Sequence, residues 1–328
     1  MKRLLAPLLV LLCLLSAGCA ARSGPVTRTG FALNTAISVT LYDSRDSAIA
    51  DGALALCASY EAVFSRTDPE SELSRLNAGA LEEVSPELAA VIAQALSYAR
   101  LSGGAFDPTM GALADLWDFS AADPAVPDPG DVAQALRGTG YAGVTIRGNR
   151  VDLPQGCRLD LGAIAKGYIA DRVRDYLVGQ GVASAMIDLG GNLYCLGVKP
   201  GGEPFRVGIQ YPYRDRNEVI AAIDASDVSV VTSGVYERCF EAEGVLYHHI
   251  LDSATGYPVQ NSLLAVTVIA PDSLTADALS TACFALGLER GMALIDSLDG
   301  VHALFITDDF ALHPSAGLEE SCRLELLS

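Results

Sequence analysis

The sequence LDLGAIAKGY, residues 159–168, is the stretch around which the rest of the chain is organised. An acidic residue, a glycine-bearing turn and a lysine lie within seven positions here, directly before an amphipathic helix predicted over 169–177. Ile169, Val173, Tyr176 and Leu177 recur at helical spacing, and the opposite face carries Asp171, Arg172, Arg174 and Asp175. The pattern predicts a ligand site at the mouth of a helix. It also suits an ordinary strand-to-helix connection whose lysine is merely solvated.

The composition indicates a globular protein with a large core. Half of the 328 residues are hydrophobic, which suits one or two domains. Lys and Arg total 22 against 40 Asp and Glu, a net charge of −18, with no block of basic residues. Nucleic acid and anionic lipid headgroups are therefore poor partners, because both bind clustered cations.

The N-terminus has the pattern of an export signal. Lys2 and Arg3 precede an apolar run over 4–15, and small residues then precede Cys19. This resembles a bacterial lipoprotein signal, with 1–18 removed, Cys19 lipidated, 19–26 as a tether and 27–328 as the folded domain. We expect a lipid-anchored protein on the extracytoplasmic face of the membrane. Ser16 stands where leucine is commoner, so ordinary cleavage and a periplasmic location stay open.

Helices and adjacent strands alternate irregularly along the chain. Helical periodicity predicts helices over 47–64, 86–102 with Ser85 as cap, 132–136 and 275–286. Strands are predicted over 31–41, 185–189, 193–197, 205–209, 219–223, 228–232, 264–270 and 301–306, with a hairpin over 144–153 and a polar turn over 233–238. This mixture predicts an α+β fold rather than a doubly wound sheet.

Two residues of the predicted helix over 275–286 suit a metal ion. Asp277 and Thr281 are four positions apart, so a carboxylate and a hydroxyl share one face. Hard oxygen ligands of this kind suit Mg²⁺ when a backbone carbonyl and water complete the shell. The same pair is also what an ordinary N-terminal acid and a back-bonding threonine present.

His248 and His249 are adjacent in a predicted strand and are expected to point to opposite faces. One of them then faces a site together with Asp252, while an ordinary hydrogen-bonded histidine remains the alternative at each position. Cys57, Cys195 and Cys283 lie in apolar patterns and are expected to be small buried side chains rather than zinc ligands.

Several of these segments together resemble the ApbE family, the FAD:protein FMN transferases. Their order and spacing agree from about residue 27 to 312. The matching motifs are SELSRLN (71–77), GAFDPT (104–109), DLGAIAKGY (160–168), DLGGN (188–192), TSG (232–234), HILDSATGYP (249–258) and TADALST (275–281). The family's early Met-Gly-Thr appears here as Leu33-Asn34-Thr35, and Thr67 stands where a tyrosine often stacks on flavin. The family resemblance implies that the sheets of the α+β fold are largely antiparallel and packed with helices.

The resemblance implies an enzyme that uses Mg²⁺ to split FAD and to transfer FMN to a Thr or Ser hydroxyl, releasing AMP. The acceptor is expected to be a flavoprotein subunit of a membrane electron-transfer complex. The resemblance places FAD contacts at Ala105, Phe106, Asp107, Asp160, Lys166 and Ile250. It places the metal at the Ala163 carbonyl, Asp277 and Thr281, with Ser280 close by. His249, or Asp252, is the expected proton acceptor.

Two further functions stay open on the sequence alone. One is a Mg²⁺-dependent FAD pyrophosphatase that gives FMN and AMP with water as the nucleophile. The other is a non-enzymatic lipoprotein that binds FAD. The Asp277 and Thr281 pair favours an enzyme.

Overall fold

A computed structural model describes residues 24–215 and 217–327. The predicted signal segment and Cys19 lie outside the described residues. The largest element is an eight-stranded sheet in which every neighbouring pair is antiparallel. Its order is β1 (Val26–Ala32), β2 (Thr35–Leu41), β5 (Ala185–Leu189), β6 (Asn192–Leu196), β9 (Val228–Gly234), β12 (Leu263–Ala270), β13 (His302–Thr307) and β14 (Leu312–Pro314).

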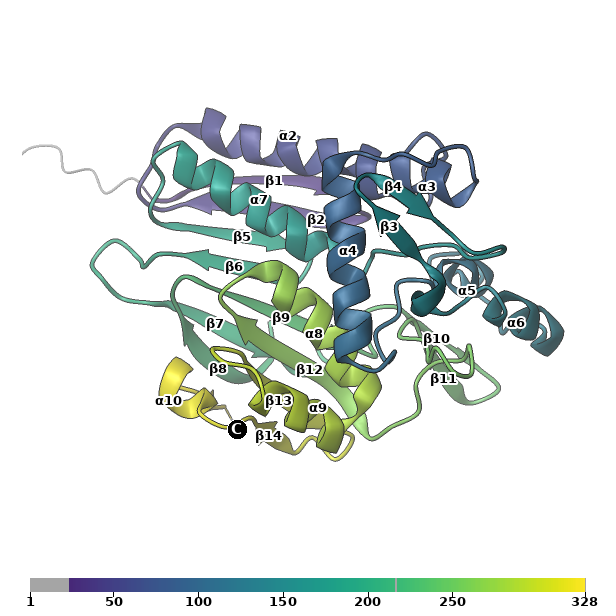
Figure 1. Cartoon of the computed structure of the whole chain (residues 1–328). Helices are drawn as coiled ribbons and strands as arrows, with labels where there is room; N and C mark the ends of the chain where they lie inside the picture. The colour runs from purple at the N-terminus through teal and green to yellow at the C-terminus, as the bar shows by residue number, and fades with distance from the viewer. Residues whose placement is uncertain (1–23, 216, 328) are drawn as a thin grey trace, which may run out of the picture.

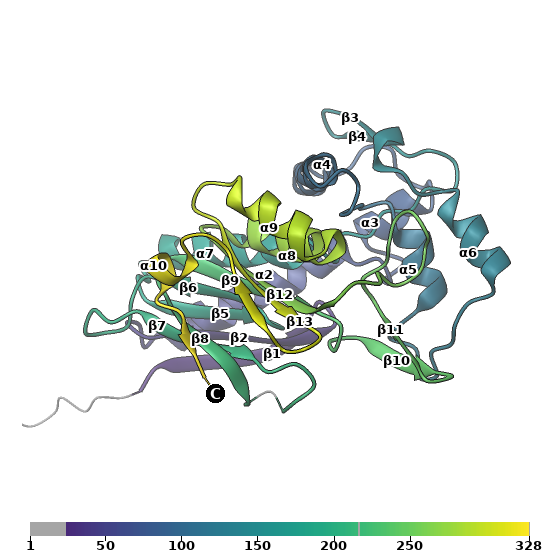
Figure 2. The same ribbon diagram turned by 90° about the horizontal axis from the view of Figure 1, so that it is seen from below.

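Four helices lie along one face of this sheet (Figures 1 and 2): α2 (Ser47–Phe64), α7 (Ala165–Gly179), α8 (Ser273–Leu286) and α9 (Leu288–Asp296). α2 covers β1 and β2, α7 covers β5 and β6, and α8 covers β9 and β12. By length and composition alone α2 is apolar enough to cross a membrane, yet its Ala50, Ala53 and Cys57 are fully buried against the fold. We therefore describe α2 as a helix of the packed domain.

A smaller antiparallel sheet completes the core of the C-terminal half. It has the order β15 (Glu325–Leu326), β8 (Val219–Ala225) and β7 (Phe205–Gln210). Every residue of β12 is buried, which requires cover on both faces of that strand. α8 packs on β12, and β7 and β8 contribute Phe205 and Ile223 to the same apolar cluster.

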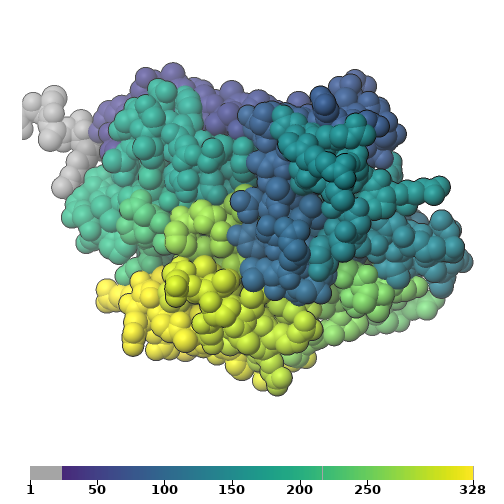
Figure 3. Space-filling view, in the orientation of Figure 1, coloured from purple at the N-terminus to yellow at the C-terminus, as the bar shows by residue number. Residues whose placement is uncertain are grey.

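α8 lies between two hydrophobic clusters. Ala278 and Ala282 belong to the cluster of the N-terminal half, whereas Leu279 and Cys283 belong to that of the C-terminal half. α4 (Pro86–Leu101), capped by the Ser85 hydroxyl, also contacts α8. Figure 3 shows the α4 segment in dark blue alongside the yellow-green C-terminal segments. Side chains on different sides of α8 thus reach both halves of the domain.

The remaining elements gather mostly at one end of the molecule (Figures 1 and 2). These elements are α3 (Glu72–Asn77), α5 (Gly111–Trp117), α6 (Pro129–Leu136), a short 3₁₀ turn (Tyr141–Gly143), β3 (Thr145–Arg147), β4 (Arg150–Asp152), β10 (Cys239–Ala242) and β11 (Val245–His248), while α10 (Leu318–Cys322) lies near the C-terminus. Trp117, buried at the end of α5, packs against aromatic rings of the β10–β11 hairpin and donates to the Gly256 carbonyl.

The α+β prediction is confirmed, as are most predicted helices and the hairpin at 144–153. The single strand predicted over 31–41 is wrong, because the chain reverses between β1 and β2. Leu33 and Asn34 form that turn with φ values of 55° and 58°. Asparagine tolerates this left-handed region but leucine does so rarely, so the usual turn signal was missing.

Three other expectations need correction. The polar turn over 233–238 begins too early, since β9 continues through Ser233 and Gly234. β11 ends at His248, so His249 follows the strand instead of lying in it. Helical spacing predicts Asp171 on the polar face of its helix, yet Asp171 is only 6% exposed, because α8 packs over that position.

Candidate functional site

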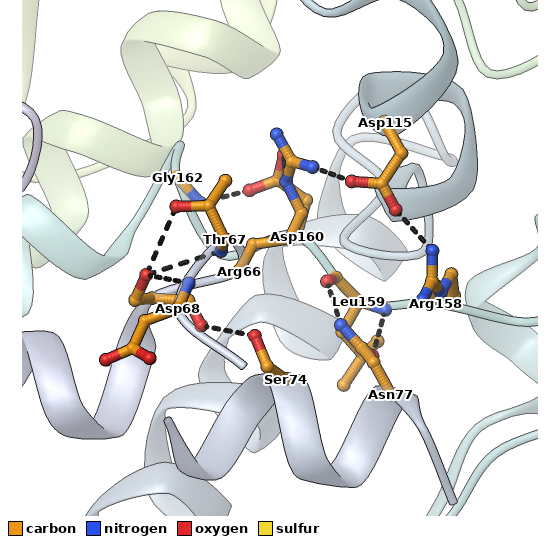
Figure 4. A network of polar contacts seen from close by, with 11 residues as sticks. Arg66, Thr67, Asp68, Ser74, Asn77, Asp115, Arg158, Leu159, Asp160 and Gly162 are labelled. Carbon is orange, nitrogen blue, oxygen red and sulfur yellow. Dashed lines mark hydrogen bonds and ion pairs between the residues drawn. The ribbon is translucent and has the colours of Figure 1, made fainter. Parts of the chain in front are cut away.

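Segment 158–164, directly before α7, is fixed by side chains from distant parts of the chain (Figure 4). Asn77, at the end of α3, accepts from the Leu159 amide at 2.7 Å and donates to the Leu159 carbonyl at 2.9 Å. The Asp160 amide donates to the Pro108 carbonyl at 2.8 Å. The loop carrying Asp160 is therefore tied to both the SELSRLN and the GAFDPT segments.

A chain of ion pairs surrounds Asp160 (Figure 4). Arg66 Nε lies 3.2 Å from Asp160 Oδ2, and the same guanidinium pairs with Asp115. Asp115 in turn pairs with Arg158 at 2.6 Å. Asp160 Oδ1 accepts from the Gly162 amide at 2.8 Å, which closes a tight turn before Ala163.

The first turn of α7 meets α8 at a very short separation. No side chain of its own caps α7; instead the Gly167 amide donates to Asp277 Oδ2 at 2.9 Å. A Cβ at position 167 would lie 2.3 Å from the Ser273 carbonyl oxygen, so only glycine allows this approach. Lys166 Nζ lies 3.6 Å from the other oxygen of Asp277. The two segments predicted to share a site are thus adjacent.

The predicted metal ligands lie around this contact. Asp277 is 3% exposed, and Thr281 follows it one turn later on α8, with its hydroxyl 3.1 Å from that of Ser233 on β9. The Ser280 hydroxyl donates to the Asp277 carbonyl at 2.9 Å and lies 2.8 Å from Ser233 Oγ. Ser280 is fully buried and already bonded twice, so Asp277 and Thr281 are the better-placed pair on α8.

These donors fit a hard divalent cation. In the described residues, no backbone amide outside the regular ladders donates to the Ala163 carbonyl, because the Gly167 amide is taken by Asp277. The same part of the chain holds no group of three or more His, Cys, Asp or Glu side chains placed to bind a metal. One carboxylate, one hydroxyl and one carbonyl make an all-oxygen set, which suits Mg²⁺ completed by water or phosphate oxygens.

The GAFDPT loop lies beside the segment that follows β11. The Ser253 hydroxyl donates to the Gly104 carbonyl at 2.7 Å, which links the two loops directly. Asp107 accepts from the amide and hydroxyl of Thr109 and, at 3.2 Å, from the Tyr141 amide. Ala105 precedes Phe106, which is 3% exposed and packs edge to face near Tyr98. The flavin contacts predicted at residues 105–107 stay predictions.

The two histidines have different environments, although His249 lies after β11 and not in it. His248 is 5% exposed, and its Nε2 lies 3.0 Å from the Val259 carbonyl oxygen. His249 is partly buried, and within the described residues its Nδ1 has no hydrogen-bond partner. Burial lowers the pKa of His249 to about 3, helped by the positive charges of Arg238 and Lys166. The His249 ring is therefore neutral near pH 7, with an unpaired Nδ1 among the described residues.

Ile250 and Asp252 complete the segment. Ile250 is buried in the C-terminal cluster, and its carbonyl accepts from the Val259 amide. Asp252 accepts from the Ala254 amide at 2.8 Å and from the Thr255 hydroxyl at 3.2 Å, so both of its carboxylate oxygens stabilise their own turn. Its role as a base stays a prediction, and its observed bonds are structural.

A hollow in the described structure lies elsewhere. It has a volume of about 410 Å³ and lies between α4, α7 and the start of α8, with Tyr98, Asp171 and Thr275 in its wall. None of the predicted flavin or metal contacts lines it. The candidate site is therefore defined by converging polar groups and not by this hollow.

Sequence reasoning missed the residues that hold the site together. Arg66, Asn77 and Ser233 bind Asp160, Leu159 and Thr281 respectively, across long sequence separations. Asn77 and Ser233 both fall inside short motifs that were noted without a role. Arg66 carries no local pattern, since its partners lie far along the chain.

Comparison with known proteins agrees with this geometry. The model of the ApbE family matches residues 33–305. The FAD:protein FMN transferase of Treponema pallidum (strain Nichols) is 39% identical over 96% of this chain and 94% of its own length. One from Klebsiella pneumoniae (strain 342) is 38% identical over 84% of this chain and 87% of its own.

Solved structures give the same result. The ApbE protein of Thermotoga maritima superposes with a TM-score of 0.82 at 35% identity, covering 90% of this chain and 98% of that one. The flavin transferase ApbE of Vibrio cholerae gives 0.79 at 30% identity, with coverages of 90% and 98%. The family resemblance and the expected fold are confirmed. Since the family model spans most of the sequence and close relatives match nearly all of it, the chain belongs to the ApbE family.

Proposed function

We propose that this protein is an FAD:protein FMN transferase that requires Mg²⁺. It transfers FMN from FAD to a threonine or serine hydroxyl of an acceptor redox protein and releases AMP. The single observation that carries the proposal is the contact between the Gly167 amide and Asp277, at 2.9 Å. It brings Asp277 within 3.6 Å of the Lys166 ammonium, and Thr281 follows Asp277 by one turn on α8. A carboxylate, a hydroxyl and a fixed positive charge are groups needed around a metal-bound diphosphate.

Asp277, Thr281 and the Ala163 carbonyl would hold the metal. Mg²⁺ bound there supplies charge neutralisation for the diphosphate, which is worth several kcal/mol in the transition state. Lys166 adds a fixed positive charge beside Asp277, since its ammonium lies 3.6 Å from the carboxylate. Binding and orientation by these side chains are then the main protein contribution.

The transfer step exchanges one P–O bond for another. The acceptor hydroxyl oxygen bonds to the phosphorus of the FMN half, and the bond from that phosphorus to the bridging oxygen breaks. AMP leaves with the electron pair, and the hydroxyl proton passes to a base. His249 suits this role better than Asp252, because its Nδ1 is unpaired among the described residues while Asp252 is bonded in its own turn.

Mass spectrometry of an acceptor domain tests the proposal. The purified protein is mixed with FAD, Mg²⁺ and a flavin-acceptor domain, and the acceptor is expected to gain one covalent FMN. Asp277→Ala is expected to abolish the gain. An acceptor that gains no FMN with the wild-type protein would reject the proposal.

The same experiment separates the two other functions. A pyrophosphatase releases free FMN and AMP when water is the only nucleophile, at a rate that an acceptor does not change. A flavin-binding lipoprotein retains FAD intact, and its binding largely survives Asp277→Ala. Metal-dependent turnover with transfer to the acceptor is the result that our proposal requires.

We place the enzyme on the extracytoplasmic face of the bacterial membrane, anchored by lipid on Cys19, where its acceptor is a membrane electron-transfer subunit. The signal-like pattern of residues 1–19 supports this location. In the native host, Cys19→Ala is expected to shift the protein from the membrane to the soluble fraction. Unchanged fractionation would contradict the lipid anchor.

A further inference from the structure

The start of α8 is bound by a carboxylate from α7. Asp171 Oδ1 accepts from the Ser273 amide at 2.9 Å, and Asp171 Oδ2 accepts from the Leu274 amide at 3.0 Å. Both amides belong to the first turn of α8, where no intrahelical acceptor exists. Arg174 Nη1 lies 2.9 Å from Asp171 Oδ1 and balances the buried charge.

This contact is the counterpart of the one between Gly167 and Asp277. Gly167 and Asp171 are one turn apart on α7, and Ser273 and Asp277 are one turn apart on α8. Each helix therefore presents a carboxylate to first-turn amides of the other. The two contacts together fix both the separation and the register of the helices.

Other groups hold the same point of α8 from the sheet side. The Ser273 hydroxyl donates to Asn192 on β6 and accepts from Ser229 on β9 at 2.9 Å. Ser273 is fully buried, so its position is set by α7 and by both strands. Of these partners, Asp171 binds the backbone of α8 directly.

We propose that Asp171 is a positioning residue for the metal and flavin site. By holding the first turn of α8 against α7, it sets where Asp277 and Thr281 lie relative to the Ala163 carbonyl. This inference rests on the proposed function, and it assigns Asp171 no contact with the metal or with FAD.

Asp171→Asn tests this positioning role, because the substitution keeps the shape of the side chain and replaces one acceptor oxygen by a donor. In the ligand-free protein, hydrogen exchange at the amides of residues 273–277 is expected to accelerate. The Mg²⁺ concentration for half-maximal FAD binding, followed by flavin fluorescence, is expected to rise about 10- to 100-fold, as for other residues that orient metal ligands. Saturating Mg²⁺ is expected to restore much of kcat.

Asp175→Asn is the matched control. Asp175 also pairs with Arg174 at 2.9 Å, lies on the same helix and gives the same charge change, but it is exposed and bonds to no residue of α8. Its Mg²⁺ half-saturation is expected to stay within about twofold of wild type, consistent with the small worth of exposed ion pairs.

The outcomes separate a positioning role from simple stabilisation. A lower Tm with a wild-type Mg²⁺ half-saturation in Asp171→Asn would overturn the inference. If that variant does not fold, Asp171→Glu, which keeps the charge but displaces the carboxylate by one methylene, is judged by the same half-saturation. If wild-type protein itself shows no Mg²⁺-dependent FAD binding, the proposed function fails, and the positioning role fails with it.

Discussion

The Gly167 amide donates a 2.9 Å hydrogen bond to Oδ2 of Asp277 across 110 positions of sequence. The bond serves two purposes at once. It satisfies a first-turn amide of α7, which has no capping side chain of its own, and it holds the Asp277 carboxylate beside Lys166. The stability of α7 and the geometry of the candidate metal site therefore depend on the same contact.

Gly167→Ala is expected to lower the stability of the protein and to disturb the candidate metal site. The added Cβ would lie 2.3 Å from the Ser273 carbonyl oxygen and 2.7 Å from Leu274 Cα, so the helices must separate. Overpacking of this kind costs about 1–3 kcal/mol of unfolding free energy, measurable by urea denaturation. Mg²⁺-dependent FAD binding is expected to weaken as well. Gly179→Ala at the end of the same helix is the control, because its Cβ meets nothing within 4 Å.

Lys166→Met is expected to reduce FAD affinity about 10- to 100-fold, the worth of a charged hydrogen bond. The Lys166 ammonium lies within 3.6 Å of Asp277 and 3.4 Å of the Gly162 carbonyl, at the proposed position of the diphosphate. Lys199→Met makes the same charge change on the connection between β6 and β7 and is expected to leave affinity unchanged. Equal losses in both variants would point to net charge instead of local contact.

The sequence predicted some residues of the candidate site and missed others. Helical spacing predicted Asp277 and Thr281 as a pair on one face, and the motif before α7 predicted Lys166. The structure places Lys166 beside Asp277, while their roles stay predictions. Periodicity failed at Asp171, since a charged residue on the polar side of a helix is buried here by a second helix. Helical spacing predicts which side of a single helix is polar. It does not show which backbone amides of a distant helix will need a hydrogen-bond acceptor.

The turn between β1 and β2 shows the same limit. Phe31 to Leu41 alternate well enough to suggest one strand, and Leu33-Asn34 lacks the glycine that usually marks a tight hairpin. In the folded sheet Ala32 pairs with Thr35, so the chain forms a hairpin of two strands and not one long strand. Likewise, the roles of Arg66 and Asn77 depend on tertiary contacts that no local pattern records.

Acid is expected to destabilise the protein partly through its two adjacent histidines. Burial lowers the pKa of both His248 and His249, that of His249 to about 3. Below about pH 6.5 the unfolded chain therefore binds more protons than the folded one. The contribution of the neutral histidines to the free energy of unfolding is fully present above that pH and is lost as the pH falls toward about 3. His249→Gln is expected to reduce the slope of the unfolding free energy against pH by at most about 1.4 kcal/mol per pH unit.

The measurement is urea denaturation of both proteins between pH 7 and about pH 4, where a slope can be compared directly. Carboxylates titrate in both chains and cancel in the difference. Parallel curves for wild type and His249→Gln would show that the imidazole is solvated well enough to protonate in the folded state.

Asn77→Ala is expected to loosen the loop that carries Asp160. Asn77 makes two hydrogen bonds to the backbone of Leu159, whose side chain is fully buried, so truncation leaves one amide and one carbonyl without partners (Figure 4). Leaving buried groups unpaired costs about 1–3 kcal/mol each, so the loss of both bonds is expected to lower the free energy of unfolding by about 2–6 kcal/mol. Asn77→Asp retains the acceptor for the Leu159 amide but places a carboxylate against the Leu159 carbonyl, so this variant is expected to recover little of the lost stability.

The control is Ala78→Ser at the neighbouring exposed position, which is expected to change the free energy of unfolding by less than about 0.5 kcal/mol. Wild-type stability in Asn77→Ala, measured by urea denaturation, would mean that segment 158–164 is held by the Pro108 and Arg66 contacts alone.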